Sequence, residues 1–453
     1  MALLVKQGAG HTPPVSGARW PAFVLAVVGI SSFMITLDVT ALNVALPSIG
    51  REFSVPVAAL QWVANAYTLV FAGLLLTAGA SSDRWGARRV FHGALAFFTL
   101  ASIACTLADT ISTLIIARAI QGLGAAAILP SSMALLTHAY PQATLRTRAL
   151  AIWSGISATA LVAGPLIGGA LVEAYGWRSI FFINLPVCLV ALAIAYVSAG
   201  RPATRRRAFD PLGQTLAIVA LLALTYTVIE VRSLGWHSPL IWGTFSGGIT
   251  ATILFIAVER YQRDPMLPLS LFASSTFSAS VCAAFLYNLS YYGAMFVLPL
   301  ALQAQGKSPL AVGVILIPIT LSTALLATAS GWIVSYIGPR LLAALGMLAG
   351  AIGAAALAVF GFAQWSTIIG GVLIGMGGAT LPLIVGAALA NLPSERVGIG
   401  AGVLNAARQS GGAMGIAVMG ALLYGKTLQA DISLATISSV FFTAAVLVFF
   451  RLR

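Results

Sequence analysis

The sequence predicts an all-α membrane protein that crosses the bilayer many times. Hydrophobic residues make up 59% of the 453 residues and charged residues only 8%, whereas a soluble domain carries about 25% charged residues. Apolar runs of roughly 20 residues recur along the whole chain, and each is long enough to cross about 30 Å of hydrocarbon. No run shows sustained alternation of polar and apolar residues, which argues against a transmembrane β-barrel.

Fourteen apolar runs qualify as transmembrane helices. They fall near residues 22–46, 60–80, 90–108, 112–136, 148–172, 180–199, 212–230, 239–258, 277–303, 310–334, 340–362, 366–390, 397–423 and 431–450. Asp210 can cap the helix that begins near residue 212, and Pro211 suits its first turn. We interpret residues 1–21 as a cytoplasmic tail and not as a signal peptide, because the first apolar run is full length and leads into more membrane.

An internal repeat divides the chain into two halves. GASSDRWGAR at 79–88 and GWIVSYIGPR at 331–340 share the frame G-x6-G-x-R, and both follow a predicted span. Many transporters consist of two such repeats around a central site. We therefore predict a six-helix bundle over 22–199, two linker helices over 200–265 and a second six-helix bundle over 266–453.

The basic residues predict the orientation, because cytoplasmic loops of membrane proteins are rich in Lys and Arg. With both termini in the cytoplasm, most of the 24 Lys and Arg fall in cytoplasmic loops. Arg118 and Arg408 lie inside helices. The basic residues in loops on the outer side of the membrane are Arg51, Arg178, Arg232, Lys307 and Lys426. The net charge of +13 thus reflects topology, and no nucleic-acid partner is expected. The expected location is the plasma or inner membrane.

The sequence offers no sign of enzyme chemistry. Cys105, Cys188 and Cys282 all fall within predicted spans, so neither a disulfide nor a metal site is implied. No GxxxxGK[ST] loop is present, and no stretch between the spans could hold an ATPase domain. No nucleophile and base stand together, and no cofactor is implied. Energy for any transport must therefore come from an ion gradient.

Six runs resemble the major facilitator superfamily and, within it, the fourteen-helix drug:proton antiporters. They are LDVTALNVALP (first helix), GASSDRWGARR (loop between helices two and three), ARAIQGLGAAAILP (helix four), GPLIGG (helix five, associated with antiporters), GWRSIFFINLP and NAARQSGGAMG. The resemblance covers essentially the whole chain. It implies two six-helix bundles with two extra central helices, and we expect a monomer.

The loop motif at 79–89 gathers charge at the cytoplasmic ends of two helices. Its charged residues are Asp83, Arg84, Arg88 and Arg89, and the glycines that permit close backbone approach are Gly79 and Gly86. One interpretation is a charge relay that holds the cytoplasmic gate shut in one state; the alternative is ordinary anchoring by basic residues. Ser335 stands in the second copy where the first has Asp83, so the second loop should lack this latch.

The GPLIGG motif combines close packing with a bend. Gly164 and Gly168 form a small-xxx-small pair, which lets two helices touch. Pro165 removes one backbone hydrogen bond, and Gly169 completes the resembled motif. The segment is either a seal between the halves that limits leak or generic helix packing, and the sequence leaves both open.

Asp38 and Arg118 place opposite charges inside apolar helices. Arg118 lies near the start of the span 112–136, so its long side chain could snorkel to the membrane surface. The side chain of Asp38 is too short to do so. Burying either charge alone costs roughly 2.5–3.5 kcal/mol on insertion scales. We therefore predict a shared, hydrated site in which Asp38 carries a proton and Arg118 sets how readily that proton binds.

Polar and aromatic residues on two helices are candidates to line a substrate cavity. They are Asn43 on the first span and Asn288, Tyr291, Tyr292 and Met295 on the span 277–303. They form either an adaptable pocket for an amphipathic substrate or ordinary packing. Arg408, in a half with no acid inside its spans, either binds backbone carbonyls or faces an anionic group of the substrate.

Together these features predict a proton-coupled exporter of small amphipathic compounds that works by alternating access. A proton-driven symporter for nutrient uptake would use the same fold, but the visible polar candidates are few and aromatic. A receptor that transports nothing would leave Asp38 and the loop motif unexplained. Glu230 and Asp109 lie at outer helix ends, so Asp38 is the one acid clearly inside the membrane, and dications should be poor substrates.

Overall fold

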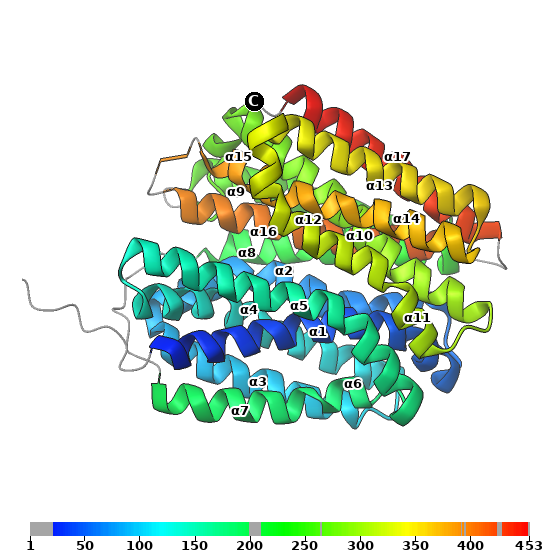
Figure 1. Cartoon of the computed structure of the whole chain (residues 1–453), viewed down its shortest axis with the longest axis horizontal. Helices are drawn as coiled ribbons and strands as arrows, with labels where there is room; N and C mark the ends of the chain where they lie inside the picture. Colours follow the sequence, from blue (N-terminus) through cyan, green and yellow to red (C-terminus); the bar gives the residue numbers. More distant parts are fainter. Residues whose placement is uncertain are drawn as a thin grey trace, which may run out of the picture.

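The computed structural model describes residues 21–198, 210–262, 265–390, 392–393, 396–423 and 428–451. Within them the chain is helical, and the helices run roughly along one common direction (Figure 1). The predicted tail up to residue 20, the basic residues Arg201 and Arg205 to Arg207, and the C-terminal Arg453 lie outside the described residues.

The first bundle contains seven helical segments. They are α1 (Pro21–Phe53), α2 (Val57–Trp85), α3 (Ala87–Thr106), α4 (Ile111–Ala139), α5 (Ala143–Tyr175), α6 (Ser179–Phe182) and α7 (Asn184–Ser198). Helix α4 packs between α2 and α3, and α1 packs along α5. Phe91, Phe98 and Phe181 are fully buried between these helices. Large apolar side chains thus fill the bundle, as the apolar runs of the sequence require.

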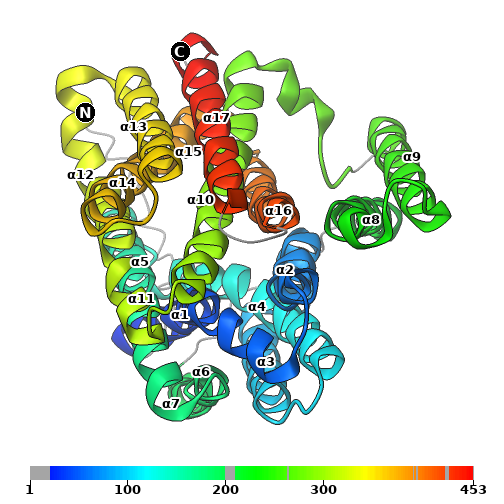
Figure 2. The same ribbon diagram turned by 90° about the vertical axis from the view of Figure 1, so that its right-hand side faces the viewer.

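The linker helices are α8 (Pro211–Leu234) and α9 (Pro239–Tyr261), which pack on each other. The Asp210 side chain accepts a hydrogen bond from Gly213 N at 2.8 Å, and Pro211 occupies the first turn, so the predicted helix start is confirmed. Helix α8 contacts both α2 and α16 (Val397–Leu422). The linker pair therefore bridges the two halves from the side, as Figure 2 shows.

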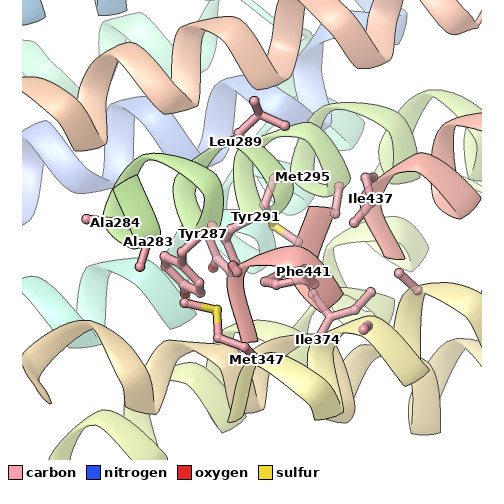
Figure 3. Close-up of a cluster of buried hydrophobic side chains, with 14 of the residues drawn as sticks. Ala283, Ala284, Tyr287, Leu289, Tyr291, Met295, Met347, Ile374, Ile437 and Phe441 are labelled. Carbon is pink, nitrogen blue, oxygen red and sulfur yellow. The ribbon is translucent and has the colours of Figure 1, made fainter. Parts of the chain in front are cut away.

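The second bundle is built around α10 (Ser275–Ala304). Its other segments are η1 (Leu269–Ala273), α11 (Pro309–Ile315), α12 (Ile317–Ile337), α13 (Pro339–Phe360), α14 (Gln364–Met376), η2 (Gly377–Ala379), α15 (Thr380–Ala390), α16 and α17 (Leu428–Arg451). Tyr287 and Tyr291 of α10 pack against Met347 and Phe441 in its apolar core (Figure 3). This core lies inside the second bundle.

Every predicted span coincides with helix, but the number that qualifies as membrane-spanning is smaller than expected. Twelve helical stretches in the described chain are long and apolar enough to cross a membrane, with α6–α7, α11–α12 and α14–α15 each counted as one. Helix α16 is not among them, since Asn405, Arg408 and Gln409 lower its apolar character. Helix α17 contributes the shorter apolar stretch Ser433–Val448. The chain is thus a multi-pass helical membrane protein with a count of twelve by these criteria.

The two loop motifs have the same backbone geometry. Gly86 joins α2 to α3 with φ +90°, and Gly338 joins α12 to α13 with φ +77°. Side chains disfavour this left-handed region, so glycine is required at both junctions. A Cβ on Gly79, in contrast, would lie 3.9 Å from Pro130 Cβ, an ordinary contact, so no close backbone approach occurs there. The two copies of the motif therefore share the same turn at their second glycine, Gly86 in one and Gly338 in the other.

The two bundles are hydrogen-bonded to each other near the end where α1 meets α2, which we call the α1–α2 end. The bonds run from Gln61 Nε2 to Ile416 O (2.9 Å) and Ala417 O (2.7 Å), from Gln303 Nε2 to Val44 O (2.8 Å), and from Leu310 N to Glu173 Oε2 (2.9 Å). Helix α11 lies beside α5 and α1 at this end (Figure 1). The halves are thus closed against each other at the α1–α2 end.

Candidate functional site

Asp38 and Arg118 form an ion pair in the interior of the first bundle. Arg118 Nη1 lies 2.5 Å from Asp38 Oδ2, and each residue is only 1% exposed. Helix α1 continues to Phe53, beyond its expected end, so Asp38 lies about 22 Å from that end. Arg118 turns inward and does not snorkel. The predicted pairing of the two charges is confirmed, but both side chains are closed off from solvent, whereas the sequence predicts a hydrated site.

Neutral polar side chains complete the coordination of the Asp38 carboxylate. Gln121 Nε2 donates to Asp38 Oδ1 at 3.0 Å, and Asn184 Nδ2 donates to the same oxygen at 2.8 Å. Gln121 Oε1 in turn accepts from Arg118 Nη1 at 2.5 Å. Ser102 Oγ accepts from Gln121 Nε2 at 2.9 Å. Groups from α4 and α7 therefore bind the carboxylate on α1, and Ser102 of α3 supports them through Gln121.

Aromatic rings enclose the Arg118 guanidinium. Its Cζ lies 4.4 Å from the centroid of the Tyr67 ring and 5.6 Å from that of Phe181. Cation–π contact is strongest where the cation is removed from water. Arg118 Nε also donates to Val63 O at 3.4 Å. The cation is thus held from several sides, while the carboxylate has only Arg118 as a charged partner in the described chain.

The sequence reasoning missed Gln121, Asn184 and Ser102. Gln121 lies three residues after Arg118, so a helical α4 places both on one face. Asn184 stands in the run GWRSIFFINLP, which carried part of the family resemblance without receiving a role. A search for uncharged polar residues one turn from a buried charge would have found Gln121. Asn184 and Ser102 are far from Asp38 in sequence, and only the fold brings them together.

The GPLIGG motif contacts two different helices. A Cβ on Gly164 would collide with Thr40 Oγ1, and one on Gly168 would lie 2.8 Å from Ala41 Cα, both on α1 of the same bundle. A Cβ on Gly169 would lie 2.5 Å from Pro309 O of the second bundle. Pro165 O faces Gly313 in the same second-bundle segment, α11. The motif therefore packs within one bundle and also against the other, which favours the sealing interpretation.

Gly169→Ala should lower transport at least tenfold without unfolding the protein. The added methyl group would meet a backbone carbonyl of the second bundle and hold the α1–α2 end apart. Gly155→Ala, on the same helix, is the matched control, because a Cβ there meets nothing within 4 Å. Transport rate and thermal unfolding of both variants would be measured. Equal transport by the two variants would contradict a sealing role for Gly169.

The loop motif lies at the opposite end of the bundle from the α1–α2 end. Arg88 Nη2 donates to Tyr196 O of α7 at 2.8 Å. Arg84 and Arg89 are exposed, and Asp83 is half-buried. Arg88 thus ties α3 to α7 within the first bundle. Whether the other charges act as a gate stays a prediction.

The residues predicted to line a substrate cavity separate into two groups. Tyr291 and Met295 are buried in the core of the second bundle (Figure 3), which corresponds to the packing alternative. Asn288 is also buried, and its Nδ2 donates to Ala284 O at 2.8 Å. Tyr292, in contrast, is half-buried and packs against the second-bundle core and against an apolar cluster that contains residues of both bundles. Asn43 is buried on α1, beside the Val44 carbonyl that receives Gln303.

Glu230 is engaged on the side of the bundle. Its Oε1 accepts from Trp62 Nε1 of α2 at 2.9 Å, and its Oε2 accepts from Ser233 Oγ at 2.6 Å. One carboxylate oxygen therefore joins α8 to α2, and the other is held within α8. This leaves Asp38 as the acid in the middle of a span, as the sequence predicts.

Two helical bundles joined by linker helices, with an ion pair buried in one of them, are the architecture of a secondary membrane transporter. The sequence profile of the Major Facilitator Superfamily matches residues 28–284. The chain belongs to this superfamily. Its membership indicates a transporter and not an enzyme.

Curated relatives extend the match over most of the chain. It is 36% identical to the Multidrug resistance protein Stp of Mycobacterium tuberculosis (strain CDC 1551 / Oshkosh), over 89% of this chain and 76% of that protein. It is 35% identical to the Methylenomycin A resistance protein of Streptomyces coelicolor, over 86% of this chain and 83% of that protein. It is 33% identical to the Tetracenomycin C resistance and export protein of Streptomyces glaucescens, over 92% of this chain and 78% of that protein.

Solved structures share the fold at low sequence identity. The crystal structure of the POT family transporter PepTSo aligns with a TM-score of 0.71, covering 95% of this chain and 97% of that one. Sequence identity is 12%, so this likeness concerns the fold alone.

Proposed function

We propose that the chain is a proton-coupled exporter of small amphipathic compounds. The observation that carries the proposal is the Asp38 carboxylate, which is buried in mid-span and paired with Arg118. Ionisable residues inside a membrane are costly and mark proton or substrate pathways. Export is favoured over uptake because the relatives are named for resistance and export. The proton gradient is the energy source, and no cofactor is needed.

In the coupling step a proton would bind Asp38 in place of its ion pair with Arg118. When Asp38 is ionised, Arg118, Gln121 and Asn184 all bind it. A proton on Asp38 removes the charge that Arg118 neutralises, so the arginine and its neighbours must rearrange. Proton release restores the network. A change in the packing of α1 against α4 is therefore linked to the proton, and α1 also touches α10 and α11 of the second bundle.

The proposed topology has fourteen spans with both termini in the cytoplasm. Helices α16 and α17 complete the second bundle, since α16 packs on α10 and α2 while α17 packs on α13. The distribution of basic residues then makes the α1–α2 end the outer side. In this orientation the structure is closed toward the outside. The protein would work as a monomer in the bilayer of the plasma or inner membrane.

The substrates would be neutral, zwitterionic, anionic or singly cationic. A dication needs more than one compensating charge on leaving water. Asp38 is already neutralised by Arg118, and Glu230 is held at the α8–α2 contact. Bivalent quaternary ammonium compounds should therefore be poor substrates.

Proteoliposomes with an imposed pH gradient test the function. A panel of labelled compounds would include methylenomycin A and tetracenomycin C, which appear in the names of the relatives. We expect at least one compound to move against its own gradient, opposite to the protons. Movement in the same direction as the protons would favour the uptake symporter. Failure of the pH gradient to drive any compound would refute the proposal.

A further inference from the structure

Arg408 is a cation in the middle of α16 whose hydrogen bonding is incomplete. Its Nη1 donates to Asn405 Oδ1 at 3.2 Å. Its Nε is buried and has no hydrogen-bond partner among the described residues. The side chain as a whole is half-buried, so part of it can be reached from outside the chain. A buried donor without a hydrogen bond is unfavourable, and more so when it carries charge.

Helices α10 to α16 of the second bundle contain no acid that could neutralise Arg408. The sequence contains no Asp or Glu from residue 266 to 394 or from 396 to 430, a stretch that covers α10 to α16. In the first bundle, Asp38 is already bound to Arg118. Because an unpaired cation in a membrane span is costly, a partner of opposite charge is expected from outside the chain.

An aromatic surface lies beside this cation. Gly412, one turn after Arg408, faces the Tyr292 ring, whose Cδ2 would be 3.1 Å from a Cβ placed there. Because residues four apart share one face of a helix, Arg408 lies on the side of α16 that faces this ring. Tyr292 packs against the second-bundle core and against an apolar cluster that contains residues of both bundles, so it lies near the boundary between the halves. A guanidinium and an aromatic ring thus occur together at this boundary.

The chemistry of these groups selects a carboxylate. A guanidinium binds a carboxylate through two parallel N–H donors. The neighbouring ring offers a flat apolar surface for the body of a ligand. A second cation would be repelled, and a neutral ligand would leave the charge of Arg408 uncompensated.

We propose that Arg408 and Tyr292 form a subsite for the carboxylate of an aromatic or apolar acid. The inference rests on the proposed export function, because it names the substrate class of that exporter. Asp38 then serves the proton and Arg408 serves the substrate, from opposite halves of the protein. The negative carboxylate of the substrate then pairs with the positive charge of Arg408, for which helices α10 to α16 offer no acid.

Binding of a matched pair of probes to the whole purified protein tests the subsite. Nalidixate and its methyl ester share one aromatic body and differ in a single negative charge. Binding would be followed by thermophoresis without any pH gradient. We expect the wild type to bind the carboxylate about tenfold more tightly than the ester. Arg408→Gln should remove that preference by weakening carboxylate binding alone, and Arg408→Lys should restore part of it because the charge returns.

Two controls separate charge recognition from folding. Arg260→Gln removes an exposed arginine at the end of α9 and should leave the preference intact. Thermal unfolding would report whether Arg408→Gln is folded. If it is not, binding by Arg408→Lys still tests whether residue 408 sets the preference for the carboxylate. A wild type that binds both probes equally, or an Arg408→Gln variant that keeps the preference, would overturn the subsite. Either result leaves proton-driven export of other compounds intact, so the two proposals fail separately.

Discussion

Asp38→Asn should abolish transport driven by a pH gradient while substrate affinity stays within a few-fold. The amide has the shape of the carboxylate but cannot cycle between a charged and a neutral form. Without that cycle, proton movement is no longer linked to rearrangement of the Arg118, Gln121 and Asn184 network. The measurement is uphill transport in proteoliposomes, with substrate binding recorded on the same preparation.

The variant should remain folded because the site can accommodate an amide. Asn184 Oδ1 is buried and has no hydrogen-bond partner in the described chain. A flip of the Asn184 amide would let that oxygen accept from the amide nitrogen introduced by the substitution, while the introduced amide oxygen accepts from Arg118. Gln121 Nε2 would lose its acceptor on residue 38 and keep its hydrogen bond to Ser102 Oγ. Asp109→Asn, at an exposed position between α3 and α4, is the matched control and should transport normally. Uphill transport that persists in Asp38→Asn would remove Asp38 from the coupling mechanism.

The Asp38–Arg118 pair was predictable because the energetics allow few alternatives. A short acid in mid-span has to find a cation, and only Arg118 and Arg408 lie inside spans. The neutral members of the site were not predictable in this way. A buried Asn or Gln can satisfy itself on a nearby carbonyl, as Asn288 does on Ala284 O. Asn184 reaches Asp38 only because α6 and α7 fold back against α1 and α3.

The direction in which a helix face points also depends on packing that periodicity does not contain. Helix α10 carries polar and aromatic residues on several sides, and sequence spacing grouped Tyr291, Tyr292 and Met295 together. In the structure two of them enter the second-bundle core, and Tyr292 is only partly buried and also packs against an apolar cluster that contains residues of both bundles. The helix count differs for a related reason. Helix α16 contains Asn405, Arg408 and several glycines, so its mean hydropathy is too low for it to be counted as a span.

Arg118→Gln should destabilise the protein by about 3–5 kcal/mol, the usual cost of leaving one member of a buried ion pair without its partner. Gln121 and Asn184 would still donate to Asp38, but neither carries charge. Unfolding in detergent by heat, compared with the wild type, measures the loss.

The double variant Asp38→Asn/Arg118→Gln isolates the pairing energy. Replacing both members of a buried pair by neutral groups of similar size is often close to neutral for stability. We therefore expect the double variant to unfold nearer to the wild type than Arg118→Gln does, although it should not couple transport to protons. The rings of Tyr67 and Phe181 would lose their cation in both variants, so their contribution cancels in the comparison. If the double variant were less stable than Arg118→Gln alone, the charge of Asp38 would not be the cause of the instability. The arginine would then stabilise the bundle mainly through its contacts with Tyr67, Phe181 and Val63 O.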